Sequence, residues 1–381
     1  MTIDLGAGSR LDRSGIREVM DLAASLENVL HLEVGEPDFP TPPHVVEAAQ
    51  RAIADGVVKY TVSRGLPTLR ELIAAKLRDR NGVDAGAARV VVSAGGTPAI
   101  LETLMVFLHP GDGILVPDPG WPVFALSASL QQARVLRYRV RPETGYLPDL
   151  DELAALAPRA RVLVVNSPSN PTGAVYDRAT LEALYELARR HNLAILSDEV
   201  YEDIVFDGEH VSLSALDEDG RVASIFSFSK GYAMTGWRIG YVTGPSAFVE
   251  TLVKVQEPVI GCPSYVSQKA AEAALTGPQD VLATRRDEYR ARRDAVIPLL
   301  REHGLFVAEP RGTFYAMANV SPLGADTYDV ARRLLLQERV AVAPGETFGP
   351  GGAGLVRLSL AGSLDVVTEA VARVAAAVSR A

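Results

Sequence analysis

The chain has 381 residues, of which 48% are hydrophobic and 22% charged, as is typical of a globular protein large enough for one large and one smaller domain. Its net charge of −9 argues against nucleic acid or an anionic membrane as the main partner. The single cysteine, Cys262, excludes an intrachain disulfide, and no segment resembles a signal peptide or a membrane-spanning helix. We therefore expect a cytoplasmic protein.

The N-terminal part alternates between predicted helices and an extended loop. Residues 17–26 have helical spacing, and Leu32 and Val34 suggest a short strand. Four prolines between residues 36 and 43 then predict an extended loop. Gly35, just before this loop, is either a close approach of the backbone to a ligand or a plain turn glycine. Helices follow at residues 45–54 and 69–78.

The middle of the chain alternates between strands and helices. Strands are predicted at residues 89–93, 113–116, 135–140, 161–166, 193–196 and 222–228, and helices at 99–108, 121–130, 150–156 and 180–190. Such alternation predicts an α/β fold with a mostly parallel sheet and helices on both faces. Ligands on such sheets bind beyond the carboxyl ends of the strands, where Asn170, Asp198 and Lys230 are expected to converge.

The glycine-rich turn A-G-G-T-P after the strand at 89–93 is a candidate anion site. It directs free N–H groups and a helix N-terminus, which Pro98 is expected to begin, at one point. A tight turn without a ligand is the alternative.

The C-terminal part is predicted to form a smaller domain. After helices at 246–255 and 266–275, a charged helix at 279–303 leads into strands at 313–320, 340–343 and 355–360 and helices at 327–338 and 364–378. We expect a segment at 1–44 that packs on the small domain, a large domain at 45–277 and a small α+β domain at 278–381.

Two familiar motifs do not apply to this chain. Gly349, Gly351 and Gly354 match a dinucleotide fingerprint, but they precede a strand, so we interpret them as a flexible loop. The histidines are scattered and form no cluster with cysteine, so no metal site is expected.

Lys230 directly follows the buried strand at 222–228. Burial lowers the pKa of a lysine, which favours attack of the amine on a carbonyl to form a Schiff base. A solvated lysine at a strand end is the alternative.

Seven motifs in this order resemble the class I/II aminotransferases of fold type I, from Ser14 to Val356 and beyond. They are G-E-P-D-F, K-Y-T, A-G-G-T, N-S-P-S-N-P-T-G, S-D-E-V-Y, S-F-S-K and V-R-L-S. The resemblance implies pyridoxal 5′-phosphate as cofactor. It also implies ping-pong transfer of an amino group from an L-amino acid to a 2-oxo acid.

The resemblance assigns roles around the cofactor ring. Lys230 corresponds to the Schiff-base lysine, which also shuttles a proton, and Asp198 to the partner of the ring nitrogen. Tyr201 and Asn170 correspond to donors to the ring hydroxyl, and Trp121 to the aromatic residue stacked on the ring. From the residues alone, Asp198 could cap a helix, Asn170 could serve its own turn and Trp121 could be a core residue.

The cofactor phosphate and the substrate have their own set of residues in the family. Gly96, Thr97, Ser227 and Arg238 correspond to the phosphate ligands. Tyr60 corresponds to a residue that reaches the phosphate of the neighbouring subunit, which implies a homodimer with composite active sites. The substrate residues are Gly35, Asn170 and Arg357, and Arg357 corresponds to the arginine that binds the α-carboxylate.

One departure bears on the substrate. Related bacterial aspartate aminotransferases often have a lysine where this chain has Thr97, so we expect neutral or aromatic amino acids to be better donors than aspartate. Arg13 or Arg64 could replace that lysine. The alternatives to an aminotransferase are a carbon–sulfur β-lyase of the same fold and, more remotely, a non-catalytic regulator built on it.

Overall fold

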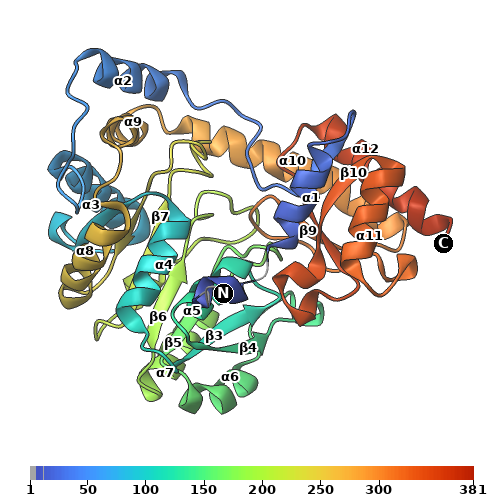
Figure 1. Cartoon of the computed structure of the whole chain (residues 1–381), viewed down its shortest axis with the longest axis horizontal. Helices are drawn as coiled ribbons and strands as arrows, with labels where there is room; N and C mark the ends of the chain where they lie inside the picture. Colours follow the sequence, from blue (N-terminus) through green and yellow to red (C-terminus); the bar gives the residue numbers. More distant parts are fainter. Residues whose placement is uncertain (1–5, 12) are drawn as a thin grey trace, which may run out of the picture.

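Two β-sheets organise the computed structural model, which describes residues 6–11 and 13–381. The predicted N-terminal segment at 1–44 therefore lies partly outside the described residues. One sheet has seven strands in the order β2-β8-β7-β6-β5-β3-β4, and the other has four in the order β1-β10-β11-β9. Figure 1 shows the smaller sheet with α11 and α12 toward the C-terminal end of the chain.

The seven-stranded sheet is parallel except for β8, which runs antiparallel to β2 and β7. Its strands are β2 (Val90–Ser93), β3 (Gly113–Asp118), β4 (Arg134–Arg139), β5 (Val162–Asn166), β6 (Ala194–Asp198), β7 (Val222–Ser227) and β8 (Gly240–Thr243). The predicted α/β class with a mostly parallel sheet is confirmed.

Both faces of this sheet are covered by helices, because its strands are apolar on both sides. Val162 and Val164 of β5 pack with α4, α5 and α8, whereas Leu163 and Val165 pack with α6 and α7. A further core joins α2, α3 and α9 to β2 and β7. These helices are α2 (Pro43–Ala54), α3 (Pro67–Asn81), α4 (Gly96–Phe107), α5 (Pro122–Leu130), α6 (Leu150–Leu156), α7 (Arg178–Arg190), α8 (Ser246–Ile260) and α9 (Tyr265–Thr276).

The four-stranded sheet joins the two ends of the chain. β1 (Leu30–Leu32) pairs in parallel with β10 (Val340–Pro344), and β11 (Leu355–Ser359) lies antiparallel between β10 and β9 (Tyr315–Asn319). The helices here are α1 (Gly15–Ala23), α10 (Asp280–Glu302), α11 (Thr327–Arg333) and α12 (Leu364–Ser379). α1 packs on β10 although they are far apart in sequence (Figure 1). The predicted division at 44/45 and 277/278 stays a prediction, and the separate sheets favour it.

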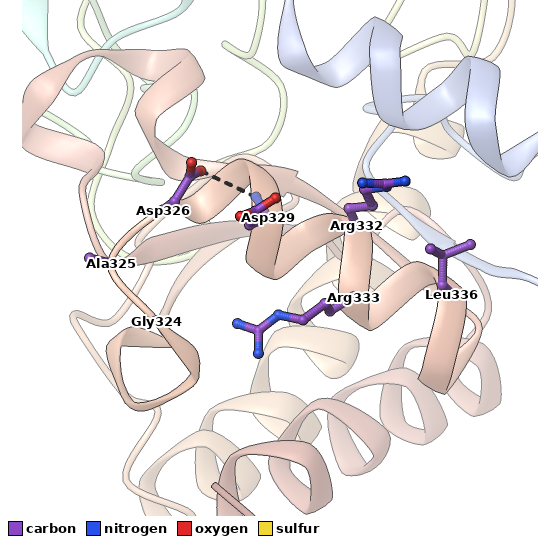
Figure 2. Close-up of a pocket in the computed structure, with 7 residues that line it drawn as sticks. All are labelled: Gly324, Ala325, Asp326, Asp329, Arg332, Arg333 and Leu336. Atoms are coloured by element: carbon purple, nitrogen blue, oxygen red, sulfur yellow. Dashed lines mark hydrogen bonds between the residues drawn. The ribbon is translucent and has the colours of Figure 1, made fainter.

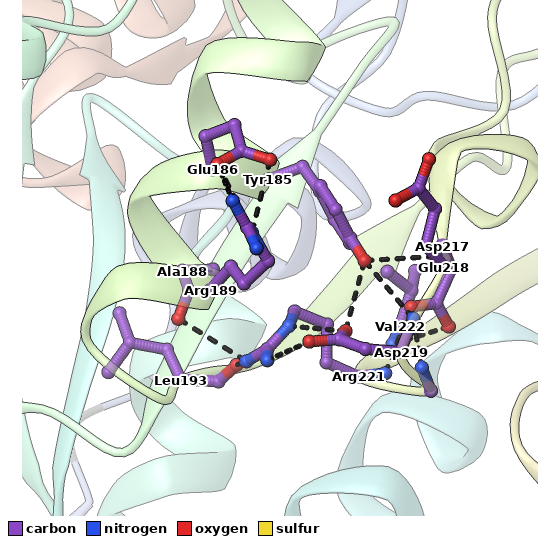
Figure 3. Close-up of polar contacts among 11 residues, drawn as sticks. Tyr185, Glu186, Ala188, Arg189, Leu193, Asp217, Glu218, Asp219, Arg221 and Val222 are labelled. Atoms are coloured by element: carbon purple, nitrogen blue, oxygen red, sulfur yellow. Dashed lines mark hydrogen bonds and ion pairs between the residues drawn. The ribbon is translucent and has the colours of Figure 1, made fainter.

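A polar cluster at the start of β7 fixes this strand to α7 (Figure 3). Arg221 donates to the carbonyl oxygens of Ala188 at 3.3 Å and Leu193 at 2.8 Å. The hydroxyl oxygen of Tyr185 accepts from the backbone N–H of Glu218 at 2.9 Å.

Two local predictions were wrong in detail. α4 begins at Gly96 rather than at Pro98, because Gly95 has a φ of +95° that lets the chain turn earlier. The predicted helix at 327–338 continues as a π-helical turn over Leu334–Glu338, a change in hydrogen-bond spacing that leaves the apolar periodicity nearly intact. The glycines near 350 precede β11 as predicted, but Gly351 N–H donates to Asp118 Oδ1 at 2.8 Å.

Within residues 6–11 and 13–381, no helix is long and apolar enough to cross a membrane. In the same residues, no three His, Cys, Asp or Glu side chains are grouped so that they could hold a metal ion.

Candidate active site

A cavity of about 720 Å³ lies where β5, β6 and β7 end, between the seven-stranded sheet and residues of β9, β11 and α1. Asn166 of β5, Asp198 of β6 and Ile225 of β7 lie side by side in register, which explains why side chains just past these strands meet. All the predicted site residues except Tyr60 line it: Gly35, Gly96, Thr97, Trp121, Asn170, Asp198, Tyr201, Ser227, Lys230, Arg238 and Arg357.

Lys230 extends into this cavity from the turn after β7. Its Nζ donates to the carbonyl oxygen of Gly35 at 2.6 Å and lies 5.6 Å from the ring centroids of both Tyr201 and Phe314. Burial lowers the pKa of Lys230, and the positive charges of Arg357 and Arg238 act in the same direction. A lysine in this state can present a neutral amine, as covalent attachment of a carbonyl requires.

Asp198 is a buried carboxylate at the end of β6, with a relative exposure of 1%. Its Oδ1 accepts from the backbone N–H of Val200 at 3.3 Å. Burial raises the pKa of Asp198 to about 7, and the negative charge of Glu199 contributes, whereas Lys230 opposes the rise. A buried carboxylate in this situation is stabilised by a cationic N–H at the cavity.

Arg357 and Asn170 form a joint polar wall of the cavity. One guanidinium nitrogen of Arg357 donates to Asn170 Oδ1 at 3.0 Å, and the other donates to the carbonyl oxygen of Glu33 at 2.5 Å. The guanidinium also lies 4.1 Å from the ring centroid of Tyr315. In the described part of the chain, its buried Nε has no hydrogen-bond partner, and both hydrogen bonds of the guanidinium go to neutral amide oxygens. Arg357 can therefore bind an incoming anion.

Tyr315 lines the cavity but was not predicted from the sequence. Its hydroxyl lies 2.9 Å from that of Tyr201, which is thereby held over the Lys230 amine. A Cβ on Gly35 would lie 1.6 Å from Tyr315 Oη, so the glycine provides room for this tyrosine. Nothing in the local sequence of β9 distinguishes Tyr315 from a core aromatic residue.

A cationic corner lies at the start of α4. A Cβ on Gly95 would lie 2.7 Å from a guanidinium nitrogen of Arg238, so the glycine lets this arginine approach the first turn of the helix. Arg238 has a φ of +51° and donates to the carbonyl oxygen of Thr235 at 2.7 Å. Ser227 Oγ accepts from the backbone N–H of Ser229 at 3.1 Å. Hydroxyl, guanidinium and helix N-terminus together suit a phosphate.

Another part of the lining comes from α1 and α5. Trp121, at the N-terminus of α5, contacts Phe124 edge-on with a centroid distance of 5.7 Å. The apolar lining residues from these two helices and the N-cap of α5 are Ile16, Met20, Trp121, Val123 and Leu126, and Val34 after β1 also lines the cavity. The exposed Arg17 also lines the cavity.

The arginines suggested from the sequence are not at the cavity. Arg13 pairs with Asp21 at 2.6 Å, and Arg64 donates to the carbonyl oxygen of Ala88 at 3.1 Å. Helical spacing alone could not show that Arg17, rather than Arg13, lines this wall, because that depends on how α1 packs.

Tyr60 lies outside the cavity of its own chain. It is 97% exposed and belongs to a segment in which Val57, Val58 and Val62 are exposed as well. The structure of a single chain therefore does not bring Tyr60 together with the other predicted site residues.

A second depression of about 360 Å³ lies at α11 (Figure 2). Asp326, Asp329, Arg332 and Arg333 around it are exposed, and Asp326 Oδ1 accepts from the N–H of Asp329 at 3.2 Å as an ordinary helix cap. It contains neither a lysine nor a buried carboxylate, so the cavity at Lys230 is the better candidate.

The residues at that cavity fit pyridoxal phosphate. The lysine with a lowered pKa, the buried Asp198 without a strong cationic contact and the space that Gly95 leaves beside Arg238 supply an amine, a partner for a ring N–H and a phosphate cradle.

Comparison with known proteins identifies the family. Residues 27–374 match the family Aminotransferase class I and II. The chain is 38% identical over 373 residues to the aspartate/prephenate aminotransferase of Thermus thermophilus, covering 96% of this chain and 94% of that protein. It is 40% identical over 353 residues to an arginine–pyruvate transaminase of Pseudomonas aeruginosa, covering 92% and 90%.

Solved structures agree with this identification. The aspartate aminotransferase from Thermus thermophilus with maleate superposes with a TM-score of 0.93 at 36% identity, covering 98% of this chain and 100% of that chain. The alanine aminotransferase from Pyrococcus furiosus superposes with a TM-score of 0.93 at 31% identity, covering 100% of both chains. The chain therefore belongs to the class I and II aminotransferases and is a pyridoxal-phosphate-dependent aminotransferase of fold type I.

Proposed function

We propose that this enzyme moves an amino group from an L-amino acid to a 2-oxo acid in ping-pong half-reactions, with the cofactor attached to Lys230. The observation that supports this best is the pairing of two features in one cavity. Arg357 is a buried cation whose hydrogen bonds go to neutral amide oxygens, and Lys230 is a buried amine with a lowered pKa. The carboxylate of an α-amino acid would bind Arg357, and Lys230 would take the proton from its α-carbon.

When bound, the cofactor supplies an aldehyde and an electron-withdrawing ring that stabilises negative charge at the substrate carbon. Lys230 Nζ would hold the cofactor, and its free amine would move the proton at the substrate α-carbon. The lowered pKa of Lys230 suits this work because a general base must be deprotonated near the operating pH.

Asp198, Asn170 and Tyr201 orient the cofactor ring in this proposal. The Asp198 carboxylate accepts the ring N–H. Asn170 Oδ1 already accepts from Arg357, so its amide nitrogen remains free to donate to the ring hydroxyl. Tyr201 would donate to the same hydroxyl, which would leave Tyr315 as the donor in the hydrogen bond between the two tyrosines. Trp121 would cover one face of the ring and exclude water from it.

The backbone N–H groups of Gly96 and Thr97, the hydroxyl of Ser227 and the guanidinium of Arg238 bind the phosphate in this proposal. Tyr60 of a second copy completes the site. Val57, Val58 and Tyr60 are each at least half exposed, which favours burial of this segment in a homodimer. The partner's contribution would make each active site incomplete in a single chain.

The substrate lies between Gly35, Asn170 and Arg357, with its side chain toward α1 and α5. Because most of that wall is apolar, we propose neutral or aromatic amino acids as the preferred donors. Relatives are named for aspartate, arginine and alanine, so the family alone does not decide the donor.

Two measurements test this proposal. Borohydride reduction of the holoenzyme followed by peptide mapping should label Lys230, and a label on another lysine would refute its role. A panel of L-amino acids with 2-oxoglutarate should then show amino transfer that requires the 2-oxo acid. Release of pyruvate and ammonia from cystathionine without any 2-oxo acid would instead identify a β-lyase.

A further inference from the structure

The segment after β6 has three acidic residues that lie behind the cavity rather than in it. Asp198 and Tyr201 line the cavity, whereas Glu199, Glu202 and Asp203 do not. Glu202 pairs with Lys76 of α3, and Asp203 pairs with Arg80 of the same helix. These carboxylates anchor the segment from the side opposite the substrate.

Glu199 is the central anchor, with a relative exposure of 1%. Its Oε1 accepts from Ser197 Oγ at 2.9 Å and from Ser224 Oγ at 2.7 Å. Its Oε2 lies 3.0 Å from His210 Nε2. One carboxylate thus joins β6, β7 and the loop at 207–212.

Glu199 and His210 stabilise each other's charged form. Burial by itself would raise the pKa of Glu199, but the hydrogen bond and charge of His210 and the bond from Ser224 outweigh burial and lower it. Burial would likewise lower the pKa of His210, but Glu199 raises it. Glu202 adds to the rise of the His210 pKa, and Lys76 opposes it.

The anchor acts directly on Asp198, its neighbour in the chain. Successive side chains of an extended chain point to opposite sides, so fixing Glu199 behind the sheet directs Asp198 into the cavity. The backbone N–H of Glu199 also donates to the carbonyl oxygen of Ile225 at 2.9 Å, and Asn166 Nδ2 donates to that of Asp198 at 3.1 Å.

We propose that Glu199 and His210 form a buried ion pair that holds the Asp198 carboxylate in the cavity, and that the charge of Glu199 strengthens Asp198 as an acceptor for the ring nitrogen of the cofactor. His210 is a positioning residue that acts through Glu199. The inference rests on the proposed role of Asp198.

The charge of Glu199 raises the pKa of Asp198. A like charge raises the pKa of a neighbouring carboxyl group because it disfavours a second anion. Removing the charge of Glu199 therefore lowers the pKa of Asp198, so that Asp198 stays ionised to lower pH. Removing His210 takes away a positive charge behind Asp198 and has the opposite effect while Glu199, which still accepts from Ser197 and Ser224, stays ionised. Lys230 is the cation that faces Asp198 from the cavity side, and neither change alters it.

The test measures the dissociation constant of pyridoxal 5′-phosphate for the apoenzyme from about pH 5 to about pH 9, where the groups concerned titrate. The chains compared are the wild type, Glu199→Gln, His210→Gln and a control, His303→Gln, at an exposed histidine. On acidification, the affinity for pyridoxal 5′-phosphate should fall, and the pH at the midpoint of this fall is the quantity compared. It should be about one pH unit lower in Glu199→Gln than in the wild type and higher by a similar amount in His210→Gln. Ionisation of the cofactor phosphate is common to all chains and cancels.

Two results would overturn the inference. One is a uniform loss of affinity at every pH with an unchanged midpoint, which would show a merely structural role for the pair. The other is a shift in the same direction in both variants. If Glu199→Gln unfolds, His210→Gln still has to show the upward shift, because the carboxylate and its serine contacts remain.

An Asp198→Asn chain separates this inference from the proposed function. It should bind the cofactor weakly and without the acid midpoint of the wild type. If Asp198→Asn retains that midpoint, the role of Asp198 itself is wrong. If Asp198→Asn loses the midpoint and the other variants do not move it, only the further inference fails.

Discussion

Replacing Arg357 with lysine tests the proposed carboxylate site most directly. A guanidinium has five N–H donors, and Arg357 uses two of them for Asn170 and Glu33. Each terminal nitrogen makes one of these bonds, so each has a second N–H for one of the two oxygens of a substrate carboxylate. An ammonium has three donors in all, so it cannot satisfy both oxygens as well as Asn170 and Glu33.

The expected loss follows from this count. At least one charge-assisted hydrogen bond disappears, which is worth about 1.5–3 kcal/mol, or roughly 10- to 150-fold in kcat/KM. The affinity for pyridoxal phosphate should not change, because Arg357 is assigned no contact with the cofactor. Stopped-flow measurement of the first half-reaction provides kcat/KM for the best donor of the panel.

The matched control substrate is the primary amine that has the same side chain as the best donor but no α-carboxylate. Arg357→Lys should reduce kcat/KM for the amino acid far more than for this amine. Arg78→Lys, at an exposed arginine, should leave both unchanged. Equal losses for amino acid and amine in Arg357→Lys would refute the reasoning, since the arginine would then not act on the carboxylate.

Three further predictions concern assembly, substrate and stability. Mixing inactive Lys230→Ala and Tyr60→Ala chains should restore activity if the sites are composite, whereas mixing Lys230→Ala with Arg238→Ala should not; sedimentation of a fully active monomer would contradict this. Aspartate should have a lower kcat/KM as donor than alanine, phenylalanine or methionine. If kcat/KM for aspartate is instead higher by roughly tenfold or more, the prediction is wrong. Loss of that advantage in Arg17→Gln would then show that Arg17 replaces the missing lysine. Burial raises the pKa of Glu102 from 4.5 to about 7. The free energy of unfolding therefore falls as the pH rises through this range, because the carboxyl group ionises more readily in the unfolded chain. Glu102→Gln should therefore raise the free energy of unfolding in urea at about pH 8, by at most roughly 3 kcal/mol, and change it little at about pH 5; an equal effect at both values would contradict the assignment.

The amino-acid sequence by itself determined the layer architecture and the place of the site. Alternating apolar strands and amphipathic helices predict a parallel sheet, and parallel strands end at one edge. Asn170, Asp198 and Lys230 could therefore be placed together from their positions after strands alone. Their chemistry followed from residue type, because a lysine, a carboxylate and a glycine-rich turn suit one cofactor.

Only the tertiary structure decided which side chains from other elements complete that edge. Tyr315 occupies the space beside Gly35, and Arg17 rather than Arg13 lines the wall, because these contacts depend on where the four-stranded sheet and α1 lie beside the cavity. Glu199 and His210 are eleven residues apart and become a buried pair only when the loop at 207–212 folds behind β6. Burial and charge at one position are properties of the whole arrangement of neighbours, and no local pattern in the sequence encodes them.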